Sequence, residues 1–106
     1  MPERADFAER VLAAVEAIPA GRVMTYGDVA EYAGIRSPRS VGQVLAADGG
    51  TVPWHRVLRH DGSMAPHIRD EQRARLRAEG VRFHGQRSER VDLTAYRWDG
   101  VSTSAE

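Results

Sequence analysis

The chain of 106 residues is 42% hydrophobic and 28% charged, a balance typical of a globular protein and not of a disordered one. It contains no cysteine, which excludes disulfides, thiolate metal sites and any cysteine nucleophile, and no apolar run approaches the length of a membrane span. The net charge is zero, which argues against nucleic-acid binding through bulk charge alone, although residues 20–59 carry five Arg against three acidic residues.

The N-terminal part of the chain predicts one amphipathic helix. Apolar residues recur at helical spacing over residues 7–18, and Pro19 ends the pattern. Asp6, with Glu9 three residues later, has the spacing of a capping box. The first residues do not have the pattern of a signal peptide, so we expect a cytoplasmic location.

Two short helices are predicted next, over residues 26–33 and 38–47. Thr25 is a suitable N-cap for the first, and Gly34 ends it. Ser37 followed by Pro is a strong start for the second, with the hydroxyl as N-cap. A tight segment joins the pair, which is the pattern of a helix-turn-helix, although many helical domains contain such a pair without binding DNA.

The remaining predicted elements are short. Residues 22–24 predict a brief strand or extended turn, residues 51–58 a loop that runs into a buried segment, and residues 68–79 a helix closed by Gly80. The length favours a single domain over residues 1–106, in which residues 99–106 look like a frayed tail.

Three segments of the sequence carry a family resemblance. Residues 18–30 read Ile-Pro-Ala-Gly-Arg-Val-Met-Thr-Tyr-Gly-Asp-Val-Ala, residues 39–42 read Arg-Ser-Val-Gly, and residues 53–57 read Pro-Trp-His-Arg-Val. In this order and spacing they resemble the C-terminal domain of O6-alkylguanine-DNA alkyltransferases, over about residues 7–83. The resemblance implies a mainly α fold with a winged-helix-like arrangement, a helix-turn-helix and minor short strands.

The sequence departs from that family at its central residue. Trp54 stands where alkyltransferases carry the cysteine that accepts the alkyl group. An indole offers only an N–H donor and no nucleophilic lone pair, and the chain has no cysteine at any other position, so alkyl transfer by the family mechanism is excluded. The sequence therefore resembles the alkyltransferase-like subgroup, whose members bind alkylated DNA without repairing it and pass the lesion to nucleotide excision repair.

The resemblance also implies a DNA-binding surface. Arg39 corresponds to the finger that enters through the minor groove and fills the gap left by the flipped base, and Tyr26 to the residue that pushes on the flanking phosphate. Without the resemblance, the two side chains would be read as a solvated arginine and a packed tyrosine. The small residues Ser40 and Gly42 let the helix enter a narrow groove, although a glycine here also suits helix packing. The predicted DNA-binding residues are Tyr26, Ser37, Arg39, Ser40 and Gly42.

A lesion pocket is expected beside this surface. Trp54 alone would be read as a core aromatic, but in this family it becomes an apolar wall that can stack on a purine. Arg69 is the candidate to cover the base, and His67 is the alternative. The predicted pocket residues are Tyr26, Leu45, Pro53, Trp54, Val57, Met64 and Arg69.

Asp48, His55 and Glu79 match the hydrogen-bonded network around the family's reactive cysteine. With the nucleophile absent, we expect this network to be structural. The histidines lack the spacing of a zinc site, so neither a metal nor a cofactor is expected.

The expected partners are double-stranded DNA containing O6-alkylguanine and nucleotide excision repair proteins, with no membrane association and a monomeric state. Two rival hypotheses remain. A helix-turn-helix transcription regulator could use the same helices, but Ser40 and Gly42 are too short to read bases. A glycosylase could work through Glu79 or Asp48, but no water-positioned carboxylate motif supports it.

Overall fold

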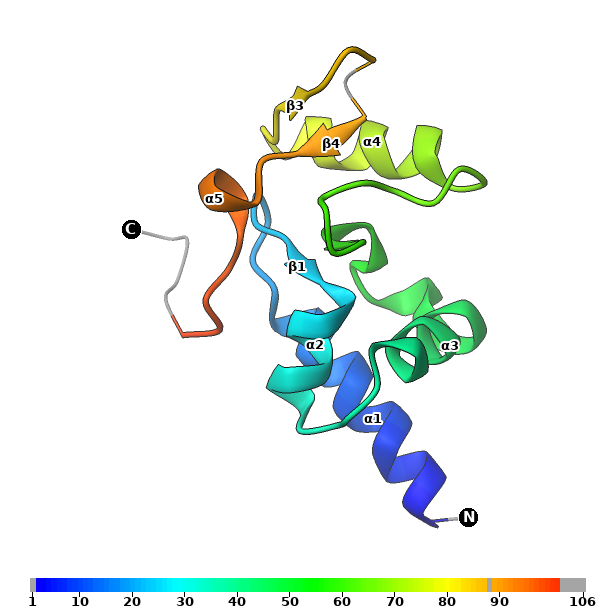
Figure 1. Ribbon diagram of the computed structural model, residues 1–106. Coiled ribbons are helices and arrows are strands. Elements are labelled where there is room, and N and C mark those ends of the chain that lie inside the picture. The colour runs from blue at the N-terminus through cyan, green and yellow to red at the C-terminus, as the bar shows by residue number, and fades with distance from the viewer. Residues whose placement is uncertain (1, 88, 102–106) are drawn as a thin grey trace.

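The computed structural model describes residues 2–87 and 89–101, which are mainly helical, as the sequence predicts (Figure 1). The strands are each two residues long. In chain order the elements are α1 (Pro2–Ala17), β1 (Met24–Thr25), α2 (Tyr26–Ala33), α3 (Pro38–Asp48), the 3-10 turns η1 (Gly49–Thr51) and η2 (Trp54–Arg56), β2 (Val57–Leu58), α4 (Arg69–Ala78), β3 (Phe83–His84), β4 (Arg90–Val91) and α5 (Leu93–Tyr96).

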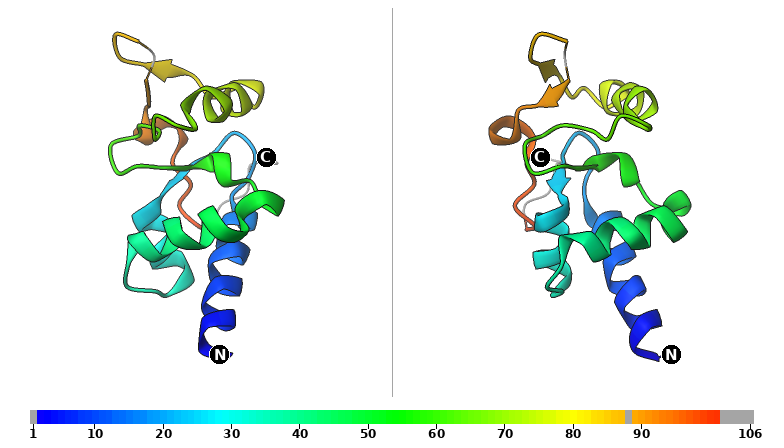
Figure 2. Two further views of the ribbon diagram at one scale, coloured as in Figure 1. Left: turned by 90° about the vertical axis from the view of Figure 1, so that its right-hand side faces the viewer. Right: turned by 45° about the vertical axis from the view of Figure 1, so that its right-hand side comes forward.

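Two hydrophobic cores lie at the two ends of the molecule. The first is formed where α1 packs against α2 and α3, and the second lies beneath α4 and the antiparallel pair of β3 and β4. In both views of Figure 2, α1 extends from one end while α4 and β3 occupy the other. None of the described helices is long and apolar enough to cross a membrane.

The start of α1 differs from the sequence prediction. The helix begins at Pro2, five residues before the predicted start at residue 7, because proline is favoured in the first helical turn and the following residues have good helix propensity. The predicted capping role of Asp6 is therefore wrong. Asp6 lies inside the helix and pairs with Arg10, one turn later, at 3.6 Å.

The helix-turn-helix follows its predicted boundaries closely. Asp28 N–H donates to Thr25 Oγ1 and Thr25 N–H donates to Asp28 Oδ2, both at 3.0 Å, so α2 begins with a complete capping box. Gly34 ends α2 in the left-handed conformation, with φ 75°. Pro38 begins α3 as predicted, but the Ser37 hydroxyl makes no capping hydrogen bond, so that part of the prediction is wrong. The fixed φ of Pro38 and the extended backbone of Ser37 start the helix without it.

A parallel strand pair joins the two ends of the molecule. Met24 of β1 pairs with Val57 of β2, and Thr25 pairs with Leu58. Successive side chains of a strand point to opposite faces, so Val57 packs into the first core and Leu58 into the second. This pair fixes the position of the segment that precedes Val57, which carries Trp54.

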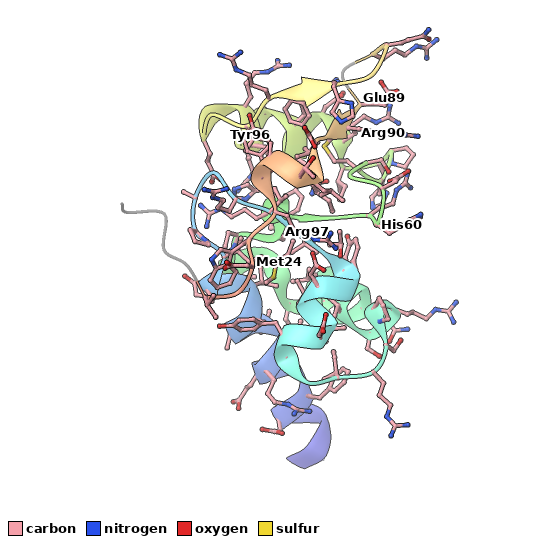
Figure 3. All side chains as sticks on the ribbon, turned by 60° about the vertical axis from the view of Figure 1, so that its left-hand side comes forward. Met24, His60, Glu89, Arg90, Tyr96 and Arg97 are labelled. Atoms are coloured by element: carbon pink, nitrogen blue, oxygen red, sulfur yellow. The ribbon has the colours of Figure 1, made fainter. Side chains whose placement is uncertain are left out.

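The C-terminal segment returns to the helix-turn-helix. Arg97 donates to both carboxylate oxygens of Asp28, at 2.8 and 2.9 Å, and Trp98 N–H donates to the Val23 carbonyl at 2.8 Å. Figure 3 shows Arg97 close to Met24, between α5 and α2. Trp98 completes the first core, where its ring packs against Tyr32. Residues 102–106, most of the predicted frayed tail, lie outside the described residues.

Candidate nucleic-acid interface

An apolar pocket of about 380 Å³ lies between the helix-turn-helix and the loop that precedes α4. Its volume falls in the range of small-molecule sites, roughly 300–1,000 Å³. The residues that line it come from α2, α3, the two 3-10 turns and the loop: Tyr26, Gly42, Leu45, Ala46, Gly49, Gly50, Trp54, Ala65, His67 and Ile68. Such a lining suits a flat, largely apolar group better than a charged one.

Trp54 forms one wall of this pocket and is held from outside it. Its ring meets the neighbouring His55 ring edge-on, with centroids 6.3 Å apart. The guanidinium of Arg75, on α4, lies 5.4 Å from the centroid of the indole, and Glu71 accepts two hydrogen bonds from this arginine at 2.8 and 3.1 Å. The sequence analysis missed Arg75. The approach of α4 to the indole follows from tertiary packing, and no local motif signals it.

A second, more open hollow adjoins the pocket. This groove, of about 740 Å³, is lined by Thr25, Tyr26, Gly27, Pro38, Arg39, Gly42, Gln43, Ala46, Arg59 and His60. Tyr26, Gly42 and Ala46 line both hollows, so groove and pocket are continuous. Arg39 is exposed at the second position of α3 and has no ion-pair partner among the described residues.

The predicted DNA-binding residues divide between two faces of α3. Arg39 and Gly42 face the groove together with Tyr26. A Cβ built on Gly42 would lie 3.9 Å from the Tyr26 ring, so the glycine leaves room between helix and ring. Ser40 lies instead on the neighbouring face, in a hollow that it shares with α1, and Ser37 lines neither the groove nor the pocket.

The predicted pocket residues are only partly brought together. Tyr26, Leu45 and Trp54 line the pocket. Val57 and Met64 do not, because their side chains are 1% and 3% exposed in the first and second cores, so their prediction as pocket walls is wrong.

Two further predicted residues lie just outside the pocket lining. Pro53 precedes η2 and Arg69 begins α4, and neither is among the lining residues. His67, the predicted alternative to Arg69, does line the pocket.

Glu79 is the acceptor at the centre of a hydrogen-bonded network behind Trp54. It accepts from His55 Nε2 at 2.7 Å, from Arg56 Nη2 at 2.7 Å and from the Gly21 N–H at 3.0 Å. Burial alone would raise the pKa of Glu79, but these donors outweigh burial and lower the pKa to about 2. Arg56 also donates to the Ile18 carbonyl at 2.8 Å, which ties the network to the end of α1.

Asp48 is not part of this network, which corrects the prediction from the sequence. The residue is exposed at the last position of α3 and lines the hollow shared with α1. The turn η1 then carries the chain away before His55 is reached. Nδ1 of His55 is buried and has no hydrogen-bond partner among the described residues.

The pocket wall lacks the thiol that alkyl transfer by this route would need, and its mostly apolar lining suits the binding of a flat group. Trp54 offers an aromatic surface and no nucleophile, and the chain has no cysteine. The Glu79 carboxylate already accepts hydrogen bonds from Gly21, His55 and Arg56, which leaves it poorly placed to act as a base. Within residues 2–87 and 89–101, no group of three or more His, Asp or Glu side chains is placed to hold a metal ion.

The fold and the site define a helix-turn-helix domain with an apolar pocket beside an arginine-lined groove. Residues 6–81 match the family model described as the DNA-binding domain of 6-O-methylguanine DNA methyltransferase, and the chain belongs to this family.

The chain is similar to relatives that are named as a DNA base-flipping protein and as an alkyltransferase-like protein. The chain is 46% identical over 104 residues to the DNA base-flipping protein of Escherichia coli (strain K12), a match covering 93% of this chain and 79% of that protein. It is 34% identical over 102 residues to alkyltransferase-like protein 1 of Schizosaccharomyces pombe, covering 88% and 94%.

Solved structures confirm the predicted mainly helical fold. S. pombe Atl1, in complex with damaged DNA containing O6-carboxymethylguanine, matches with a TM-score of 0.79 and 33% identity, covering 93% of this chain and 97% of that one. The O6-methylguanine methyltransferase of Mycobacterium tuberculosis matches with a TM-score of 0.62 and 29% identity, covering 85% and 54%. The winged-helix part of the fold expectation stays a prediction.

Proposed function

We propose that the protein is a non-enzymatic sensor that binds O6-alkylguanine in duplex DNA and flips the base into the pocket beside Trp54. The observation that carries the proposal is the position of an indole, in place of a nucleophile, on the wall of an apolar pocket continuous with the groove of Arg39. The relatives named as base-flipping and alkyltransferase-like proteins, and the Atl1 complex with damaged DNA, support it.

Base flipping in this proposal is shared between two side chains of the helix-turn-helix. Arg39 enters through the minor groove and fills the hole left by the base, where its planar guanidinium can stack and hydrogen-bond to the orphaned partner. Tyr26, which stands between groove and pocket, presses on the flanking phosphate. Together these contacts offset an unstacking cost of a few kcal/mol.

The pocket holds the lesion by packing. Trp54 and Leu45 contact the purine and its alkyl group, and the site stays intact after each encounter because no covalent bond forms. His67 covers the base in preference to Arg69, since only His67 lines the pocket. The network of His55, Arg56 and Glu79 holds the segment that carries Trp54 and relays no proton.

The protein passes the lesion on because it cannot repair it. In this proposal it acts as a cytoplasmic monomer and directs the bound lesion to nucleotide excision repair proteins. A lesion held in a flipped state, with the duplex locally unstacked, provides a structural signal that a repair protein can recognise.

The test is a binding titration with matched duplexes that contain guanine or O6-methylguanine, followed by mass spectrometry of protein and DNA. We expect tighter binding to the O6-methylguanine duplex and unchanged masses for both molecules. Methylated protein or restored guanine would overturn the proposal. A preference for one undamaged sequence would instead indicate a transcription regulator, and an abasic product would indicate a glycosylase.

A further inference from the structure

A second arginine, which does not belong to α3, also lines the groove. Arg59 follows directly after β2, and its side chain lines the groove together with Tyr26 and Arg39. Since groove and pocket are continuous at Tyr26, a nucleotide whose base fills the pocket leaves its sugar-phosphate backbone in the groove. The position of Arg59 is therefore that of a backbone contact.

The Arg59 side chain is held in place by the turn that follows it. Its Nε donates to Ser63 Oγ at 2.9 Å, and the Ser63 hydroxyl donates in turn to Asp61 Oδ1 at 2.5 Å. Ser63 is only 7% exposed, so the hydroxyl that anchors Arg59 is largely shielded from solvent. The two terminal nitrogens of Arg59 make no hydrogen bond to a described residue. The guanidinium thus has one edge fixed and the other free, which reduces the entropy lost on binding.

The charge around Arg59 favours an anion. Burial raises the pKa of the Tyr26 hydroxyl, and the charge of the nearby Arg59 guanidinium opposes this rise only in part. No acidic side chain among the described residues lines the groove, whereas Arg39, Arg59 and His60 do. In Figure 3, His60 lies at the edge of the molecule on the loop after β2.

We propose that Arg59 binds a DNA phosphate flanking the flipped nucleotide and forms, together with Tyr26, a clamp on the backbone. Its free nitrogens suit the paired oxygens of a phosphate. The inference rests on the proposed function, because it takes the groove to hold DNA. Arg59 contacts no base, so it contributes affinity to lesion and undamaged duplex alike.

The experiment measures dissociation constants of the full chain for O6-methylguanine and guanine duplexes between low and moderate salt. Arg59→Gln should weaken binding to both duplexes about tenfold. Binding weakens as salt rises, so a plot of the logarithm of the association constant against the logarithm of the salt concentration has a negative slope. In Arg59→Gln this slope should be shallower by about 0.9, the value for one phosphate contact. Arg59→Lys keeps the charge but not the Nε anchor, so it should keep the slope and bind with intermediate affinity.

The matched control is Arg82→Gln, an equal loss of charge at an exposed position after α4 that lines neither groove nor pocket. Unchanged affinity and slope in Arg59→Gln, or an equal loss in Arg82→Gln, would overturn the phosphate contact. Loss of lesion preference is a separate result. If the wild-type protein binds both duplexes equally while Arg59→Gln still weakens them, the sensor function fails and the Arg59 contact stands.

Discussion

The side-chain amide of Gln72, on α4, donates a hydrogen bond of 2.8 Å to the backbone carbonyl of Val57. The same nitrogen donates to the His55 carbonyl at 3.1 Å, and Gln72 is only 1% exposed. Two carbonyls of the segment that follows Trp54 are thus held by one buried side chain from α4. The pocket wall therefore depends on α4, although no side chain of α4 lines the pocket. Only the loop before the helix contributes to the lining.

Replacing Gln72 with leucine should lower the free energy of unfolding by roughly 2–3 kcal/mol, because two buried carbonyls lose their donor. Urea denaturation measures the change. Gln86→Leu, an exposed glutamine in the loop after β3, is the control and should unfold as the wild type does. Equal stability of the two variants would show that the two hydrogen bonds do not hold the segment.

Arg75→Ala should weaken lesion binding about two- to fivefold, because the cation-π contact that holds the Trp54 indole is worth roughly 0.5–1 kcal/mol at an exposed site. Arg77→Ala is a close control, since Arg77 lies on the same helix with its guanidinium 5.8 Å from the Phe83 ring, away from the pocket. The measurement is the ratio of the affinities for lesion and undamaged duplex, which should fall in Arg75→Ala and stay at the wild-type value in Arg77→Ala. The same ratio in both would count against a role of Arg75 in positioning Trp54.

The stability of the protein should fall in acid through Glu79. The pKa of Glu79 is lowered from 4.5 to about 2 in the folded state, so its ionised form stabilises the fold fully above about pH 5 and loses that contribution as the pH falls toward 2. Glu79→Gln should cost roughly 2–4 kcal/mol near pH 7, with the difference from wild type shrinking toward pH 3. Thermal unfolding across this range tests the trend. A constant difference at all pH values would contradict it, and Glu16→Gln, at an exposed position of α1, should follow the wild type.

Arg39→Ala should abolish the preference for lesion DNA while leaving the fold intact. Without the guanidinium the hole in the duplex stays unfilled, so the ratio of the two affinities should fall by roughly 10- to 100-fold. Arg36→Ala removes an equal charge from the turn between α2 and α3, lines neither groove nor pocket, and should keep the preference. A preserved ratio in Arg39→Ala would mean that another residue fills the hole.

Trp54→Cys rebuilds the Pro-Cys-His-Arg-Val sequence of active alkyltransferases beside an intact pair of His55 and Glu79. We nevertheless expect transfer at least about 100-fold slower than in a genuine alkyltransferase. Asp48, which was expected in the network around the reactive cysteine, lies outside it, and a resulting misplacement of about 1 Å can cost that much. Lesion affinity should fall in the same variant, because the indole surface is lost. Single-turnover incubation with O6-methylguanine duplex, scored as methylated protein, gives the rate. A rate matching the genuine enzyme would show that Trp54 alone prevents transfer.

The local parts of the fold could be predicted from the sequence because their signals are local. Thr25, Asp28 and Gly34 set the ends of α2 through contacts within a few residues, and the predicted boundaries were confirmed. The start of α1 was mistaken because Asp6, a good N-cap, is also tolerated inside a helix when Arg10 lies one turn later.

The site was predicted less completely because its walls are set by tertiary contacts. Whether Val57 faces the pocket or the core depends on its pairing with Met24, which no local pattern fixes. Asp48 was placed with His55 on family spacing, but η1 separates the two. Arg59 and Arg75 are exposed arginines among many, and only the turn at Ser63 and the packing of α4 distinguish them.

Asp28 has two partners, one three residues before it and one 69 residues after it. A ribosome delivers Thr25 and Asp28 together, so α2 can form early, but Arg97 and Trp98 arrive only at the end of synthesis. Until then the first core lacks its last aromatic and Tyr32 has no ring to pack against. A chain cut short before residue 97 therefore keeps α2 and α3 but lacks the Arg97 and Trp98 contacts that hold α2.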